Sequence, residues 1–132
     1  MQDLCATADL VILDFTINDA LLSPTTYNTT YPTNLQTLIN TAKAGGAAVM
    51  LMTGNPCNTV SNITDTTQQN VRQAITSVAQ SNNLPLLDQY AKFTSWDAMN
   101  ALGYMYNKNH PNTAGYAALG TFVGDTLAAW AA

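Results

Sequence analysis

Two short, almost continuous apolar runs constrain the fold of this chain more than any other feature. Residues 8–17 read Ala-Asp-Leu-Val-Ile-Leu-Asp-Phe-Thr-Ile, and residues 47–53 read Ala-Ala-Val-Met-Leu-Met-Thr. Runs of this length and composition are typical of strands in a parallel sheet that is covered on both faces. A shorter run over residues 84–88 predicts a third strand.

Amphipathic segments separate these runs, as the crossovers of a parallel sheet require. The first is predicted to begin with a capping box formed by Thr33 and Gln36 and to end at the glycines of residues 45–46. The second is predicted to begin with Asp65 and Gln68 as its capping pair. The stretch from residue 20 to residue 31 has no periodicity, which predicts a loop.

The last third of the chain predicts two more helices. Residues 93–103 form a short one with Ser95 as its cap, and Asn112 is a suitable N-cap for the final helix. The order is strand, helix, strand, helix, strand and helices, which predicts an α/β fold with a parallel sheet in a single domain over residues 1–132. The final helix has its apolar residues at helical spacing: Tyr116, Leu119, Val123, Leu127 and Trp130.

Composition excludes several classes of function. Only 9% of the 132 residues are charged, the net charge is −4 and the pI is about 4.3, so binding to a phosphate backbone is not expected. No apolar run is long enough to span a membrane, and the first eight residues do not read as a signal peptide. Two cysteines and one histidine do not make a structural zinc site, and we expect neither a metal nor a cofactor.

Polar side chains follow the predicted strands at their carboxyl ends, where open α/β sheets bind ligands. Asn18 and Asp19 end the first strand, Asn55 follows the second, and His110 lies in the last loop, before Pro111. Asn18 could donate its side-chain amide and His110 could act as a general base in acyl transfer. The simpler readings remain open, a turn for residues 18–19 and a surface or capping role for the histidine. Asp19 and Asn55 are candidates for substrate binding.

Two of these segments resemble blocks of the SGNH (GDSL-type) hydrolases. Residues 8–19 are similar to the third block, a strand that usually ends in Gly-x-Asn-Asp, and residues 107–115 are similar to the fifth, usually Asp-x-x-His-Pro-Asn-x-x-Gly. The resemblance covers nearly the whole chain but only the second half of the family's domain. It implies a flavodoxin-like three-layer α/β/α fold with a partial parallel sheet, and ester hydrolysis by a serine esterase with His110 as base and Asn18 as oxyanion donor.

The chain departs from the family pattern at three points. Thr16 replaces the glycine of the third block, and Asn107 replaces the acid of the triad. The block Gly-Asp-Ser-Leu, which carries the nucleophile, is absent. An amide at position 107 can accept a hydrogen bond from the imidazole, or donate one and hold the wrong tautomer. An inactivating substitution, or a histidine oriented by a backbone carbonyl, would each account for Asn107.

The leading hypothesis is therefore the carboxyl-terminal portion of an SGNH-type esterase that acts on acylated small molecules or carbohydrates, for example as a carbohydrate O-acetylesterase. Its alternative is a non-catalytic structural or glycan-binding module of a virion or cell-surface protein. In either case we expect a secreted or virion-associated location. The nucleophilic serine would come from a missing N-terminal half or from a companion chain. The strand at residues 10–17 would lack a neighbour, so we expect it to pair with a companion polypeptide or with a second copy of the chain.

Overall fold

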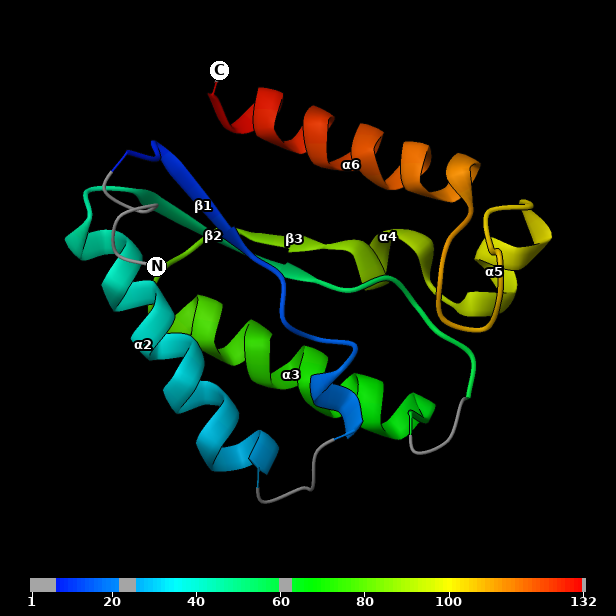
Figure 1. Cartoon of the computed structure of the whole chain (residues 1–132), viewed down its shortest axis with the longest axis horizontal. Helices are drawn as coiled ribbons and strands as arrows, with labels where there is room; N and C mark the ends of the chain where they lie inside the picture. The colour runs from blue at the N-terminus through cyan, green and yellow to red at the C-terminus, as the bar shows by residue number, and fades with distance from the viewer. Residues whose placement is uncertain (1–6, 22–25, 60–62, 132) are drawn as a thin grey trace.

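The structure, a computed structural model, describes residues 7–21, 26–59 and 63–131. It confirms the prediction of three strands in a parallel sheet, and the strands lie in the order β1-β2-β3. Figure 1 shows α2 and α3 on one face of the sheet and α6 on the other. In chain order the elements are β1 (Leu10–Leu13), η1 (Asp19–Leu21), η2 (Thr26–Thr30), α2 (Tyr31–Ala44), β2 (Ala48–Thr53), α3 (Asp65–Ser81), β3 (Leu86–Asp88), α4 (Gln89–Phe93), α5 (Trp96–Ala101) and α6 (Thr113–Ala131).

The first strand is shorter than its apolar run predicts. Only Leu10–Leu13 pair with β2, in the register Leu10 to Ala48 and Leu13 to Leu51. Beyond Leu13 the sheet ladder is replaced by contacts of Thr16, whose hydroxyl accepts a hydrogen bond from the Gly54 N–H at 2.7 Å. The Thr16 carbonyl accepts another from the N–H of Ala20. These contacts turn the chain out of the sheet into η1.

The predicted capping box at Thr33 is wrong. A single turn of π-helix, η2, runs into α2, so α2 begins at Tyr31, and Thr33 lies inside the helix. The Thr33 hydroxyl donates to the carbonyl of Thr29 instead of accepting from a helix N–H. The segment before α2, predicted as a loop, is thus helical over its described part.

The start of α3 also differs by one residue from the prediction. Thr64 is the N-cap, and its hydroxyl accepts from the N–H of Thr67 while the Thr67 hydroxyl accepts from the N–H of Thr64. This reciprocal pair satisfies two N–H groups and replaces the predicted pair of Asp65 and Gln68. Gln68 is buried and bonds the backbone of Cys57 through both ends of its amide.

The helices cover the two faces of the sheet unequally. The face under α2 and α3 forms the continuous core, in which Leu35, Ile39 and Ile75 are almost completely buried against β2. On the opposite face α6 buries Leu119 but leaves Tyr116 and Trp130 57% and 51% exposed. A helix of 19 residues is about 28 Å long, whereas a strand of six residues reaches only about 20 Å, so α6 extends beyond the sheet.

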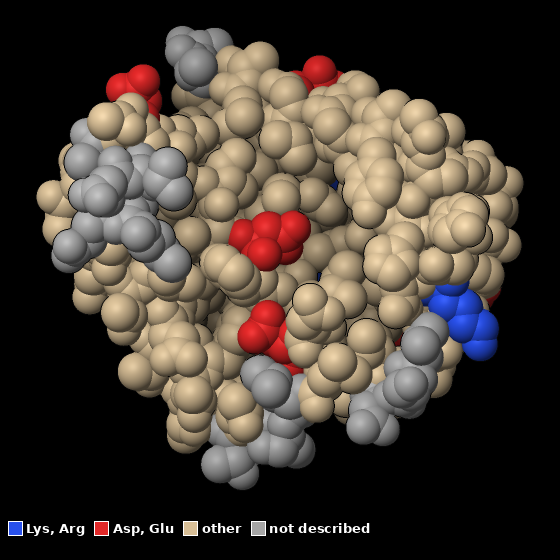
Figure 2. Space-filling model, viewed as in Figure 1, with Lys and Arg blue, Asp and Glu red and all other residues tan. Residues whose placement is uncertain are grey.

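The outer edge of β1 has no partner strand in the described part of the chain. Figure 1 shows β1 in front of β2 and β3, so Figure 2, from the same direction, looks onto this open edge and shows acidic atoms in the middle of a hollowed face. Phe15 and Leu21 are 47% and 48% exposed beside it. None of the described helices is long and apolar enough to cross a membrane.

Candidate active site

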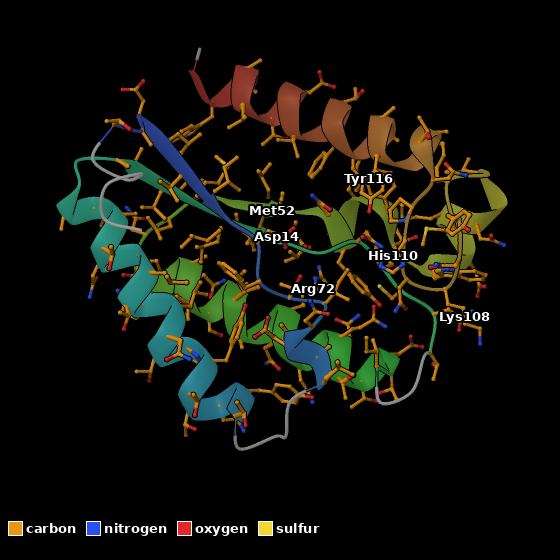
Figure 3. All side chains as sticks on the ribbon, viewed as in Figure 1. Asp14, Met52, Arg72, Lys108, His110 and Tyr116 are labelled. Carbon is orange, nitrogen blue, oxygen red and sulfur yellow. The ribbon has the colours of Figure 1, made fainter. Side chains whose placement is uncertain are left out.

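His110 lies exposed in a tight loop beyond the carboxyl ends of the strands (Figure 3). Met105 and Pro111 form an antiparallel bridge across this loop. Inside it, the carbonyl of His110 accepts hydrogen bonds from the N–H groups of Tyr106 and Asn107 at 2.9 and 3.3 Å. The backbone that carries the imidazole is therefore fixed on both sides.

The side-chain oxygen of Asn107 orients the imidazole. It accepts from the backbone N–H groups of Asn109 and His110, each at 2.8 Å, and lies 3.1 Å from Nδ1 of His110. A backbone N–H can only donate, so the amide atom that faces these groups is the oxygen. Nδ1 must then carry the proton and donate it to Asn107, which leaves the lone pair on Nε2. This is the tautomer that a general base requires.

The beginning of α6 holds the loop against the preceding turn. Asn112 caps the helix, as predicted, by accepting from the N–H of Gly115 at 3.0 Å, and its amide donates to the carbonyl of Gly103 at 2.7 Å. A Cβ at Gly115 would collide with the carbonyl oxygen of Tyr104. Glycine is therefore required at this position of the His-Pro-Asn-x-x-Gly segment.

The loop after β2 joins the histidine loop to the sheet. The side-chain amide of Asn55 donates to the carbonyl of Asn109 at 3.2 Å, and the N–H of Asn58 donates to the carbonyl of Lys108 at 2.8 Å. Asn55 is 8% exposed. The amide that we considered for substrate binding is thus engaged inside the protein.

Asn18 lies beyond the end of β1, in the turn directly before η1, and its side chain is exposed. Two residues earlier, Thr16 binds the N–H of Gly54. A Cβ at Gly54 would lie 2.5 Å from the Thr16 hydroxyl oxygen, so the close contact between these two residues requires glycine at position 54. The loops that carry Asn18 and His110 are therefore both attached to residues 54–58.

The carboxylates near β1 lie on the open side of the molecule. Burial raises the pKa of Asp19, partly opposed by a backbone hydrogen bond. Although Asp14 is partly exposed, crowding by protein atoms raises its pKa as well, and the hydrogen bond from Thr16 opposes this. Asp19 lines a hollow of about 230 Å³ with Phe15 and Tyr31. That hollow lies under the end of β1, and no residue of the histidine loop lines it.

Asp88 ends β3 and is engaged in structural contacts. Burial would raise its pKa, but hydrogen bonds from the Arg72 guanidinium, the Ala91 N–H and the Thr53 hydroxyl lower it below its usual value. The closest contact is 2.7 Å, between Nη2 of Arg72 and the carboxylate. Asp88 therefore joins α3 to β3 and is not available to replace the missing triad acid.

No nucleophile is in place among the described residues. The hydroxyls of Ser77 and Ser81 donate to carbonyls inside α3, and Ser95 caps α5, as predicted. Ser23 and Ser61 lie outside the described residues. Cys57 is a free, buried thiol whose pKa burial raises to about 11, which makes it a poor thiolate source.

Three contributors to the site were missed from the sequence. Thr16 carries a hydroxyl that joins two strand ends, Asn109 supplies the carbonyl to which Asn55 binds, and the Trp96 indole N–H donates to the carbonyl of Asn107 at 3.1 Å. Each of these contacts uses a backbone group of a distant segment. The spacing of residues in the sequence does not predict such contacts.

Comparisons with known proteins bear on the family and the fold of this chain. The model of the GDSL-like lipase/acylhydrolase family matches residues 2–118. No curated protein matches the sequence significantly. Among solved structures, a peptidoglycan O-acetylesterase superposes with a TM-score of 0.80 and 18% identity, over 98% of this chain and 40% of that one. The superposition shows the three-layer α/β fold of the SGNH hydrolases, and the chain spans about 40% of that esterase's length.

Proposed function

The chain belongs to the GDSL-like lipase/acylhydrolase family, and from this premise we propose that it supplies the general base and one oxyanion donor for ester hydrolysis. One observation carries the proposal. The side-chain oxygen of Asn107 lies 3.1 Å from Nδ1 of an exposed His110 and is held there by two backbone N–H groups. This arrangement leaves Nε2 free to accept a proton.

In the proposed reaction, Nε2 of His110 takes the proton of a serine hydroxyl as the serine oxygen attacks the ester carbonyl. The amide of Asn18 donates to the oxyanion that forms. His110 then returns the proton to the leaving alcohol, and the same steps with water in place of serine release the acid. His110 and Asn18 come from loops attached to the same segment, residues 54–58.

We propose that the serine arrives on a strand that pairs with the open edge of β1. All pairings in this sheet are parallel, so a strand that continues it ends at the edge of the sheet where Asn18 lies. A second copy related by a twofold axis perpendicular to the sheet would pair antiparallel and carry its own site to the opposite edge. A first half of the domain, supplied by an N-terminal part of the same protein or by a companion polypeptide, therefore fits the reaction better than a second copy does.

The substrate that we propose is an acyl ester of a carbohydrate. The superposed esterase is a peptidoglycan O-acetylesterase, and the low charge of this chain suits an uncharged sugar better than a phosphate. Such a substrate agrees with a secreted or virion-associated location. The alternative, a non-catalytic structural or glycan-binding module, is favoured by Asn107 in place of an acid and by the lack of a placed nucleophile among the described residues.

The test measures hydrolysis of an aryl acetate by the chain together with a polypeptide that carries a Gly-Asp-Ser-Leu strand. We expect activity only from the mixture, and His110→Ala should abolish it while changing the free energy of unfolding by less than about 1 kcal/mol, because the side chain is exposed. Asn100→Ala, at an exposed position on α5, is the matched control. Activity that survives His110→Ala would show that another group is the base.

A further inference from the structure

A single peptide group, the one that joins Asn109 to His110, is bound at both of its polar ends. Its carbonyl accepts from the side-chain amide of Asn55 at 3.2 Å, and its N–H donates to the side-chain oxygen of Asn107 at 2.8 Å. A peptide group is planar, with its C=O and N–H pointing in opposite directions. A contact that fixes the direction of the carbonyl therefore also fixes the direction of the N–H.

Asn55 is a rigid anchor for this peptide group. It is 8% exposed and lies two residues after the end of β2. The residue between them, Gly54, donates its N–H to the Thr16 hydroxyl. The amide nitrogen of Asn55 also donates to the carbonyl of Pro56 at 3.1 Å, so both of its N–H donors have acceptors. The side chain therefore has one favoured orientation, and through it the end of β2 holds the histidine loop in place.

The N–H of this peptide group helps decide which end of the Asn107 amide faces the imidazole. If the peptide group rotated, Asn107 would keep only the N–H of Asn109 as a donor to its oxygen. The amide could then turn over and donate to Nδ1 of His110, which would place the ring proton on Nε2. In that tautomer Nε2 is no longer a base.

We propose that Asn55 is a positioning residue that sets the tautomer of His110 through the Asn109–His110 peptide group and the side chain of Asn107. The proposal rests on the proposed function for its catalytic meaning, but the tautomer is a property of the chain itself. It gives Asn55, which we first considered for substrate binding, a role that needs no contact with substrate.

The test is nuclear magnetic resonance of the isolated chain labelled with ¹⁵N-histidine, at a pH where the imidazole is neutral. The single histidine gives an unambiguous signal. In the unmodified chain the Nδ1–H tautomer should dominate. In Asn55→Asp, which keeps the size of the side chain but cannot donate, the Nε2–H tautomer should become the major form.

Asn82→Asp is the control, because Asn82 is a half-buried amide that is hydrogen-bonded to Gln36, outside the histidine loop. It should leave the tautomer unchanged. If Asn55→Asp does not fold, Asn55→Ser, whose hydroxyl is too short to reach the Asn109 carbonyl, takes its place. A folded variant with an unchanged tautomer, or an unmodified chain with mainly Nε2–H, would overturn the proposal.

With a companion polypeptide, Asn55→Asp should also lower kcat between about 10-fold and about 100-fold with little change in KM, less than the loss of about 10⁴-fold that a wrong tautomer causes in serine proteases. The smaller loss is expected because the N–H of Asn109 holds a minor population in which the Asn107 oxygen still faces Nδ1, and this population stays active. A complete lack of hydrolysis by the unmodified pair would contradict the proposed function and leave the tautomer measurement unaffected. The two proposals therefore fail separately.

Discussion

At the scale of the residue, Asn107 separates two tasks that one carboxylate usually performs. Its oxygen accepts from two backbone N–H groups and faces Nδ1 of His110, so it orients the ring. It carries no charge, however, so it cannot stabilise the imidazolium that would form when His110 takes a proton in the proposed reaction. The sequence left open which nitrogen of His110 carries the proton, and these contacts favour Nδ1. The site still lacks the negative charge that a carboxylate at position 107 would supply.

Asn107→Asp should therefore increase the rate. A carboxylate of the same shape accepts the same three hydrogen bonds and adds a negative charge next to the imidazolium, and loss of this charge and its tautomer control costs about 10⁴-fold in serine proteases. Since the amide here already fixes the tautomer, we expect a gain in kcat/KM well below that figure. Asn100→Asp, which adds the same charge on α5, is the control. An unchanged rate would mean that another group already balances the imidazolium.

At the scale of the element, β1 is the strand whose surroundings are incomplete. Its inner edge pairs with β2, while its outer edge is open in the described part of the chain, next to Phe15 and to a hollow of about 230 Å³. The Tyr31 hydroxyl donates to the carbonyl of Phe15 at 2.7 Å, which fixes the backbone there. An open parallel edge flanked by an exposed aromatic ring is a surface suited to pairing with another strand.

Phe15→Lys should weaken the association with the companion polypeptide. The change places a charge where the companion would bury the ring, but it leaves the Phe15 carbonyl and its bond to Tyr31 in place. The free energy of unfolding of the chain alone should thus change by about 0.5 kcal/mol or less.

Sedimentation velocity of the mixture measures the loss of complex. Leu102→Lys, at a residue that is 63% exposed in the turn after α5, is the control and should associate normally. Equal association of both variants would show that the companion does not cover Phe15.

At the scale of the whole molecule, the three layers are held by a core on one side and by a small number of polar contacts at the carboxyl edge. The ion pair of Arg72 with Asp88 joins α3 to β3, and both side chains are partly buried. Asp14 and Asp19 lie at the same edge with pKa values raised chiefly by burial. A fall in pH therefore changes the stability of the fold in opposite directions through Asp88 and through the pair Asp14 and Asp19.

The lowered pKa of Asp88 predicts how stability depends on pH. A carboxylate whose pKa is lower in the folded state stabilises the fold above its ordinary pKa, and this contribution is lost as the pH falls through the folded value. Asp88→Asn should cost about 1 kcal/mol near neutral pH and less at about pH 3. Urea unfolding at both pH values measures this. Asp125→Asn, at an exposed position in α6, should show a much smaller difference.

The raised pKa values of Asp14 and Asp19 predict the opposite dependence of stability on pH. A carboxylate whose pKa is higher in the folded state destabilises the fold when it is charged, so protonation of Asp14 and Asp19 as the pH falls through their raised values adds stability. This gain opposes the loss at Asp88.

The sequence by itself determined the three strands, the long helices between and after them, and the positions of the two candidate site loops. The apolar runs predicted three parallel strands because a strand that is covered on both faces is apolar at almost every position, instead of alternating apolar with polar residues. Most residues of β2 are indeed buried. Asn112 and Ser95 were found as caps because a cap is a local contact of a side chain with the next turn. The segment around His110 likewise carries its own turn and helix start.

Only the tertiary structure decided how these parts act on one another. The hydroxyl of Thr16, the amide of Asn55 and the orientation of Asn107 depend on backbone groups, most of them far away in sequence, and a backbone group has the same chemistry whatever its residue. The exposure of Tyr116 and Trp130 depends on how far the sheet extends beneath α6. A periodic pattern shows which face of a helix is apolar, whereas the width of the sheet decides how much of that face is covered.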